Sequence, residues 1–131
     1  MKISAIILSA GNSTRYLSSK PKVFHELSGQ KIIDFNINLL NKYKEIKSCH
    51  IITNTALKEN FINLGYKNIS IQNPINGTGG AITQFVSKNK INADYYLICL
   101  GDTPIFNKKT IDTLIKKTKD QKLDINVLGQ N

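Results

Sequence analysis

Apolar runs of strand length alternate with segments of helical spacing along almost the whole chain. The first run, residues 3–8, shows no polar alternation, which is typical of a parallel strand that helices cover on both faces. Strands separated by helices form a largely parallel sheet with right-handed crossovers. The sequence therefore predicts an α/β fold, a Rossmann-like doubly wound and mainly parallel sheet, in a single domain over residues 1–131.

The same patterns give the expected order of the elements. Strands are predicted at residues 3–8, 48–53, 68–72, 94–102 and 123–128. Helices are predicted at residues 32–43, 56–64 and 81–88, and a further helix runs to about Lys119 from a cap at Asn107 or Thr110. A long loop, residues 9–30, joins the first strand to the first helix.

The carboxyl ends of two predicted strands form the expected ligand site. In a doubly wound sheet of order 3-2-1-4, the first and fourth strands are neighbours at the switch point, where ligands bind. The first strand leads into a loop with Gly11 and Arg15, and the fourth strand ends at Asp102. We therefore expect Arg15 and Asp102 to face the same crevice.

The residue types at this crevice suit a phosphorylated ligand. A glycine at the end of a strand lets backbone N–H groups approach phosphate oxygens. Arg15 offers a planar fork for phosphate, and Lys22 offers a compact charge. Asp102 is placed like a carboxylate that holds Mg²⁺. Together these groups indicate phosphoryl or nucleotidyl transfer, where positioning and charge neutralisation carry the catalysis.

Two other kinds of phosphate-binding loop do not match the sequence. It contains no G-x-x-x-x-G-K-[ST] motif, so a P-loop is excluded. A dinucleotide-binding loop needs G-x-G-x-x-G and an acidic residue at the end of the second strand. Those glycines are missing, and the strand at residues 48–53 ends in Thr53-Asn54-Thr55, which argues against a nicotinamide enzyme.

The net charge of +9 does not by itself indicate a nucleic-acid partner. The lysines are scattered, and the densest group, residues 108–122, is typical of the solvated face of an amphipathic helix. The charge is compatible with small anionic substrates. No stretch approaches the roughly 20 apolar residues of a membrane span, so no membrane partner is predicted.

The cysteines and histidines are interpreted as structural. Cys49 and Cys99 lie in apolar, strand-like contexts and are expected to be buried, reduced thiols of a cytoplasmic protein. His25 and His50 lie near no nucleophile or carboxylate in the sequence and are likewise expected to have structural roles.

Three segments of the sequence resemble one enzyme family. The stretch from "LSAGNSTRY" through "KPKVFHELSGQKII" resembles the opening signature of nucleotide-sugar pyrophosphorylases, which are sugar-phosphate nucleotidyltransferases. "QNPINGTGGAI" resembles their base-recognition segment, and "LICLGDTPIF" resembles their metal-aspartate segment. In order and spacing the segments are most similar to the N-terminal domain of the uridylyltransferases that make UDP-N-acetylglucosamine from UTP and N-acetylglucosamine 1-phosphate. The resemblance implies the nucleotide-diphospho-sugar transferase type of fold.

The resemblance also implies roles for individual residues. Arg15 and Lys22 would be catalytic, binding phosphates as pyrophosphate leaves, and Asp102 would hold a catalytic Mg²⁺. The residues implied to bind the nucleotide are Leu8, Ser9, Ala10, Gly11, Gln72, Gly77 and Thr78. Of these, the last three would recognise uracil. The sugar-phosphate oxygen would attack the α-phosphorus in line, with no protein nucleophile.

The chain departs from the family pattern in the loop and in length. Ser9, Ser13 and Tyr16 stand where the family signature has alanine, glycine and methionine. Relatives continue past the point where this chain ends, with sugar-binding groups and a second metal ligand, so only the N-terminal portion of the domain is expected here.

Other interpretations stay open at this point. The enzyme could use another base or acceptor, of the CTP or GTP type, or the chain could be a truncated nucleotide-binding module without turnover. UTP and a sugar 1-phosphate are the expected partners. A last strand at residues 123–128 would leave an unpaired sheet edge, so a homo-oligomer is a further expectation.

Overall fold

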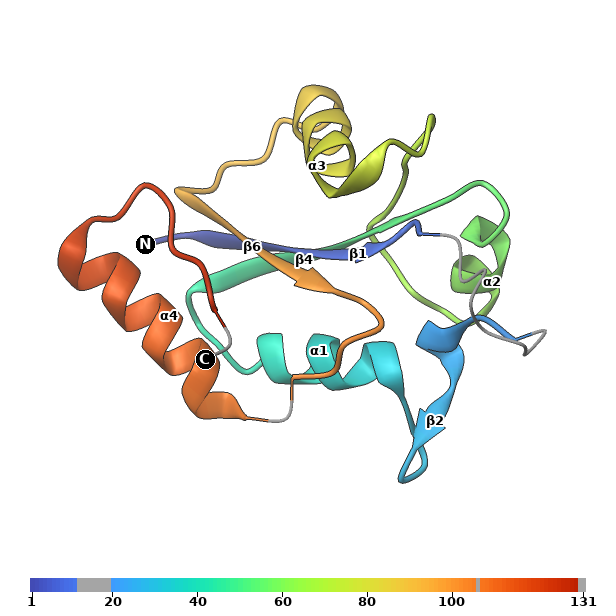
Figure 1. The fold of residues 1–131 in the computed structure, drawn as a ribbon, viewed down its shortest axis with the longest axis horizontal. Helices are drawn as coiled ribbons and strands as arrows, with labels where there is room; N and C mark the ends of the chain where they lie inside the picture. Colours follow the sequence, from blue (N-terminus) through green and yellow to red (C-terminus); the bar gives the residue numbers. More distant parts are fainter. Residues whose placement is uncertain (12–19, 106, 130–131) are drawn as a thin grey trace.

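Four parallel strands form the central sheet of the computed structural model, which describes residues 1–11, 20–105 and 107–129. They are β1 (Ile3–Ser9), β4 (Ile46–Thr53), β5 (Ile69–Ile71) and β6 (Tyr95–Leu100). In Figure 1, β1, β4 and β6 cross the middle of the molecule between the helices. The order of the four strands in the sheet is β5-β4-β1-β6, and every neighbouring pair is parallel. Counted along the chain as the predicted strands were, this is the order 3-2-1-4, so the predicted α/β class and strand order are confirmed.

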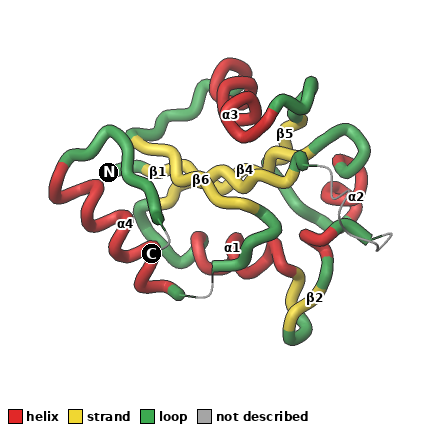
Figure 2. Tube along the Cα trace, in the orientation of Figure 1, coloured by secondary structure: helices red, strands yellow, loops and turns green. Residues whose placement is uncertain are grey.

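Helices lie on both faces of this sheet (Figure 2). On one face lies α3 (Gly77–Lys88), and on the other lie α1 (Ile32–Leu40) and α4 (Lys108–Gln121). Two shorter helices are η1 (Lys22–Phe24) and α2 (Lys58–Asn63).

The central strand β1 explains why the first apolar run carries no polar alternation. Ile3, Ala5 and Ile7 belong to the core cluster that includes residues of α1 and α4. Ile6 belongs to the opposite cluster, together with Phe85 of α3. Because helices cover both faces, every side chain of β1 except the half-buried Leu8 is buried.

A small hairpin, β2 (Glu26–Leu27) paired with β3 (Gln30–Lys31), lies inside the segment that we predicted as a continuous loop. Ser28 and Gly29 connect the two strands, and both have positive φ, as a two-residue hairpin turn requires. The strands are so short that they leave no periodic signal in the sequence.

The prediction of a strand at residues 123–128 is wrong. Residues 123–129 form no strand and run back beside α4, where the Asn126 Nδ2 donates to the Leu114 carbonyl (3.3 Å) and to the Thr118 Oγ1 (3.2 Å). Ile125 and Val127 are 81% and 77% exposed. The alternating pattern is present, but a strand forms only where its backbone pairs with a neighbour. This segment is held by a side chain of its own instead.

The other differences concern where the elements begin and end. The first helix stops at Leu40 instead of residue 43, and the helix predicted from residue 81 begins at Gly77. The strand predicted to reach residue 102 ends at Leu100. Of the two predicted caps for α4, Asn107 is the one used, because its Oδ1 accepts from the Lys109 N–H (2.9 Å).

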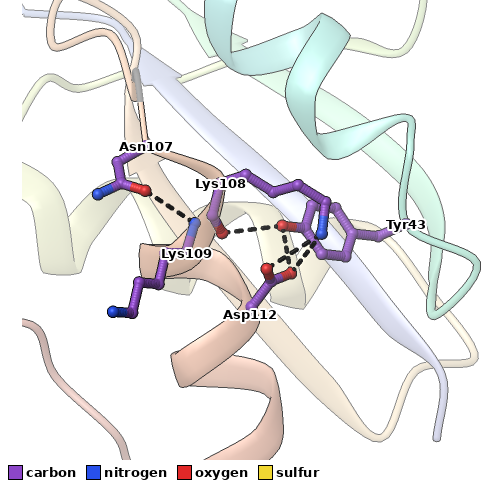
Figure 3. Close-up of polar contacts among 5 residues, drawn as sticks. All are labelled: Tyr43, Asn107, Lys108, Lys109 and Asp112. Atoms are coloured by element: carbon purple, nitrogen blue, oxygen red, sulfur yellow. Dashed lines mark hydrogen bonds and ion pairs between the residues drawn. The ribbon is translucent and has the colours of Figure 1, made fainter.

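A polar cluster fixes the start of α4 against the chain just after α1 (Figure 3). The Tyr43 hydroxyl donates to the Asp112 Oδ1 (2.9 Å) and to the Lys108 carbonyl (3.1 Å). The Lys108 ammonium pairs with Asp112 at 2.8 Å and lies 5.1 Å from the centre of the Tyr43 ring. Burial, and then the bond to Asp112, raises the pKa of Tyr43.

The prediction of buried, reduced thiols holds for Cys99, whereas Cys49 is only partly buried. Cys49 and Cys99, both described, are free cysteines. Burial raises the pKa of Cys49 to about 11 and that of Cys99 to about 12. In the described part of the chain, no helix is long and apolar enough to cross a membrane.

Candidate functional site

Lys22 and Asp102 meet at the carboxyl ends of β1 and β6. The Lys22 ammonium lies 4.0 Å from the Asp102 Oδ2. Lys22 opens the short helix η1, which begins directly after Pro21, and Asp102 follows Gly101 just past the end of β6. Arg15, the other predicted partner of Asp102, lies outside the described residues.

The two charges are close but well solvated. The side chains of Lys22 and Asp102 are 39% and 50% exposed, so their attraction contributes at most about 1 kcal/mol to folding. The Asp102 Oδ1 also accepts from the Thr103 hydroxyl at 3.3 Å. This exposure leaves room for a ligand to approach both charged groups.

The end of β1 is fixed from the neighbouring strand β4. The Ser9 carbonyl accepts from the Thr53 Oγ1 (3.2 Å), and the Ala10 carbonyl accepts from the Asn54 Nδ2 (3.2 Å). The Asn54 Oδ1 in turn accepts from the Leu57 N–H (2.9 Å). Thr53 and Asn54 are contributors that the sequence pattern did not single out, although their position at the end of the second strand was a signal for this role.

Ser9 and Gly101 approach each other closely where β1 and β6 end. The Gly101 N–H donates to the Leu8 carbonyl (2.8 Å), and a Cβ on Gly101 would collide with the Ser9 Oγ. A larger residue at this position requires the Ser9 side chain to move. Among the residues that the structure describes, the buried Ser9 Oγ has no hydrogen-bond partner.

The predicted base-recognition residues lie at the start of α3 and, for Gln72, directly after β5. Gln72 is 3% exposed, and its Nε2 donates to the Asn76 Oδ1 and to the Gly77 carbonyl, both at 3.0 Å. The Asn76 Oδ1 also accepts from the Gln84 Nε2 at 3.3 Å. The structure therefore brings Gln72 and Gly77 together. Thr78 follows Gly77 in α3. Asn76 and Gln84 are contributors that the sequence analysis missed.

The carboxylate at this site fits one way of binding a divalent metal. Within residues 1–11, 20–105 and 107–129, no three His, Cys, Asp or Glu side chains group together as a metal cluster. Mg²⁺, however, is commonly held by one or two carboxylates together with water and the phosphates of a substrate. The half-exposed carboxylate of Asp102 can supply the protein's part of that donor set, and the neighbouring Lys22 can hold the phosphates.

The described contacts of both histidines are with neighbouring parts of the fold. The His25 backbone N–H donates to the Lys22 carbonyl (3.0 Å), and the His50 Nε2 lies 3.1 Å from the Ser48 Oγ. The His50 ring packs against Phe85 with centroids 5.1 Å apart, and burial lowers its pKa. The His25 Nε2 is 2.8 Å from the Lys20 carbonyl.

Comparison with known sequences identifies relatives over almost the whole chain. The family of MobA-like NTP transferase domains matches residues 5–131. The bifunctional protein GlmU of Thermodesulfovibrio yellowstonii is 34% identical over 129 residues, 97% of this chain and 28% of that protein. The bifunctional protein GlmU of Wigglesworthia glossinidia brevipalpis is 36% identical over 114 residues, 84% of this chain and 25% of that protein. The chain thus spans little more than a quarter of the length of these curated relatives.

Solved structures share the fold at low sequence identity. CMP:2-keto-3-deoxy-manno-octonic acid synthetase complexed with CTP superposes with a TM-score of 0.74 at 18% identity, covering 93% of this chain and 49% of that one. The 4-diphosphocytidyl-2C-methyl-D-erythritol synthase of Anaerococcus prevotii gives a TM-score of 0.66 at 16% identity, covering 90% of this chain and 51% of that one.

Proposed function

The chain belongs to the family of MobA-like NTP transferase domains, which are nucleotidyltransferases, and on that premise we propose that it transfers UMP from UTP to a sugar 1-phosphate. N-acetylglucosamine 1-phosphate is the acceptor that we favour, because the curated relatives at 34% and 36% identity are GlmU proteins. The acceptor's phosphate oxygen attacks the α-phosphorus of UTP, the bond between the α- and β-phosphates breaks, and pyrophosphate leaves.

The observation that carries the proposal is the 4.0 Å separation between Lys22 and Asp102 at the switch point of the sheet. Lys22 supplies positive charge for the triphosphate, and Ser9 at the end of β1, with Ala10 and Gly11 after it, supplies backbone groups for the nucleotide. Arg15 is proposed as a second phosphate ligand. Leu8, the last predicted member of this group, immediately precedes Ser9 in β1.

Enzymes of this family generally use a divalent metal, and we propose Mg²⁺ held by Asp102. When bound there, Mg²⁺ would neutralise negative charge on the phosphates. The chain's own contribution is to hold the carboxylate beside Lys22 and to present Ser9, Ala10 and Gly11 from the adjacent strand.

The preference for uracil rests on the hydrogen bonds of Gln72. Its Nε2 is engaged by the Asn76 Oδ1 and the Gly77 carbonyl, so the side chain offers its Oε1 to a base. Uracil carries a donor at N3, which a carbonyl oxygen can accept, whereas cytosine carries an acceptor there. The first N–H groups of α3, at Gly77 and Thr78, lack partners within the helix and could donate to a uracil carbonyl.

A CTP-dependent enzyme is the second candidate. The observation in its favour is the fold shared with the synthetase complexed with CTP, at a TM-score of 0.74. Cytosine could still donate its exocyclic amine to the Gln72 Oε1. The choice of base and of acceptor stays a prediction. The same holds for the cytoplasmic location and the oligomeric state.

Thermal denaturation with each nucleotide tests the proposal. The melting temperature should rise more with UTP and Mg²⁺ than with CTP or ATP and Mg²⁺, because only uracil satisfies the Gln72 carbonyl at N3. A larger rise with CTP would support the second candidate. Equal rises with all three nucleotides would contradict recognition of a base by this chain.

A further inference from the structure

Asn36 is a fully buried amide on a helix face that is otherwise apolar. Its side chain is 0% exposed, and Ile32, Ile33 and Leu40 are the other buried residues of α1. Burying an amide without partners is costly, so an amide at such a position needs hydrogen bonds to compensate. The pattern of α1 alone would favour an aliphatic side chain here.

The partners of Asn36 all lie at the end of β6 or in the residues that follow it. The Asn36 Nδ2 donates to the Leu100 carbonyl (2.9 Å) and to the Thr103 carbonyl (3.1 Å), and its Oδ1 accepts from the Ile105 N–H (2.7 Å). These three backbone groups flank Asp102 on both sides in the sequence. One buried side chain thus fixes the backbone before and after the carboxylate.

We infer that Asn36 is a positioning residue for Asp102, which sets the carboxylate opposite Lys22 for the triphosphate and its metal. This inference rests on the proposed function. Asp102 is half exposed, and its contacts with Thr103 and Lys22 are at 3.3 and 4.0 Å, too long to fix its direction firmly. The direction of Asp102 therefore depends on the backbone that carries it, and Asn36 holds that backbone from inside the core.

A purely structural role makes a different prediction. If Asn36 only stabilised the fold, its loss would weaken ligand binding no more than any equally destabilising change elsewhere. If it positions Asp102, binding of a metal–nucleotide complex must suffer beyond the loss of stability. Formation of the Asn36 hydrogen bonds and binding of the metal–nucleotide complex would then favour each other, because coupling between two equilibria is reciprocal. Binding must therefore also stabilise the Asn36 hydrogen bonds in the unaltered protein.

The first test compares two variants for binding of UTP with Mn²⁺, followed by paramagnetic broadening of backbone amide signals. Asn36→Leu removes the three hydrogen bonds while keeping a side chain of similar size. Ile115→Ala removes buried apolar atoms from the core side of α4 and serves as the destabilised control. We expect the dissociation constant to rise about tenfold for Asn36→Leu and less than about twofold for Ile115→Ala.

The second test uses the unaltered protein, so it holds even if Asn36→Leu does not fold. Hydrogen exchange of the Ile105 amide should slow on addition of UTP and Mg²⁺ by more than the exchange of the Ile51 amide, which donates to the Asn68 carbonyl on the far side of β4 and reports general stabilisation.

The outcomes separate the two ideas. If the unaltered protein binds UTP but both variants lose affinity equally, the role of Asn36 is overturned and the proposed function stands. Equal slowing of the Ile105 and Ile51 amides has the same meaning. Failure of the unaltered protein to bind UTP with Mn²⁺ or Mg²⁺ would overturn the proposed function, and the inference with it.

Discussion

The Lys22 ammonium lies 4.0 Å from the Asp102 carboxylate, although the two residues are far apart in the sequence. Two elements produce this proximity. The parallel pairing of β1 with β6 brings the ends of these strands together, and η1 returns the chain after β1 to the same edge. Under the proposed function, these two solvent-accessible groups of opposite charge would hold phosphates and a cation together.

Lys22→Met tests whether this lysine serves a ligand or the fold. We expect binding of UTP with Mg²⁺ to weaken about tenfold, because a charge-assisted contact to phosphate is lost. The melting temperature without ligand should stay nearly unchanged, because an exposed ion pair contributes little to stability. Isothermal titration and thermal denaturation measure the two quantities.

Lys117→Met is the matched control, because Lys117 lies exposed on α4. It removes the same charge from the chain and should leave the affinity for UTP unchanged. Similar losses in both variants would indicate that the net charge of +9, and no local site, attracts the nucleotide.

Ser9→Ala should stabilise the protein. The Ser9 Oγ is buried and, in the part of the chain that the structure describes, unpartnered, and a buried hydroxyl without a partner costs on the order of 1–3 kcal/mol. We expect the free energy of unfolding, measured in urea, to rise by about 1 kcal/mol. A decrease in the free energy of unfolding would show that the hydroxyl makes a stabilising contact.

Gly101→Ala should destabilise the protein by about 1–3 kcal/mol, because the added Cβ collides with the Ser9 Oγ. The penalty should shrink in the Ser9→Ala background, so a double-mutant cycle in urea measures the coupling. Gly79→Ala is the control, because a Cβ on Gly79 meets nothing within 4 Å. Equal penalties for Gly101→Ala in both backgrounds would assign the strain to another neighbour.

The part of the site's arrangement that strand topology determines was predictable from the sequence. Parallel strands end at the same edge of a sheet, so the position of Asp102 next to the loop after β1 followed from the alternation of strands and helices. Gln72 and Gly77 lie only five positions apart, and the structure joins them with a hydrogen bond.

The missed features depend on contacts between distant segments. Asn36 reads as one polar residue in a helical pattern, and only the packed structure shows that its amide meets Leu100, Thr103 and Ile105. The alternation of residues 123–128 resembles a strand, but a sequence pattern does not reveal whether a pairing partner is near. Arg15, which the sequence favoured most strongly, lies outside the described residues.

Tyr43→Phe should loosen the start of α4. The variant removes the hydrogen bonds from the hydroxyl to Asp112 and to the Lys108 carbonyl but keeps the ring beneath the Lys108 ammonium (Figure 3). We expect the melting temperature to fall by a few degrees, as for the loss of one hydrogen-bonded group in a small domain. Tyr95→Phe is the control, because its hydroxyl forms no hydrogen bond within the described residues; an equal fall in both variants would contradict the role of this cluster.

The buried thiols predict a loss of stability at alkaline pH. Burial raises the pKa of Cys49 to about 11 and that of Cys99 to about 12, from 9.0 for an exposed thiol. Because the folded-state pKa is the higher one, this contribution to stability is fully present below pH 9 and is lost as the pH rises toward the folded-state values. Between pH 8 and pH 10, Cys99 alone should account for a fall of about 1 kcal/mol in the free energy of unfolding.

Cys99→Ala tests this assignment, because it removes the thiol that has the higher pKa from the core. The variant should be less stable than the unaltered protein at pH 8, since buried atoms are lost, but its free energy of unfolding should fall less steeply up to pH 10. Urea unfolding at pH 8, 9 and 10 measures both slopes. Parallel slopes would assign the alkaline loss to other groups, with the hydrogen-bonded tyrosines Tyr43 and Tyr66, whose pKa values are also raised, as the next to replace with phenylalanine.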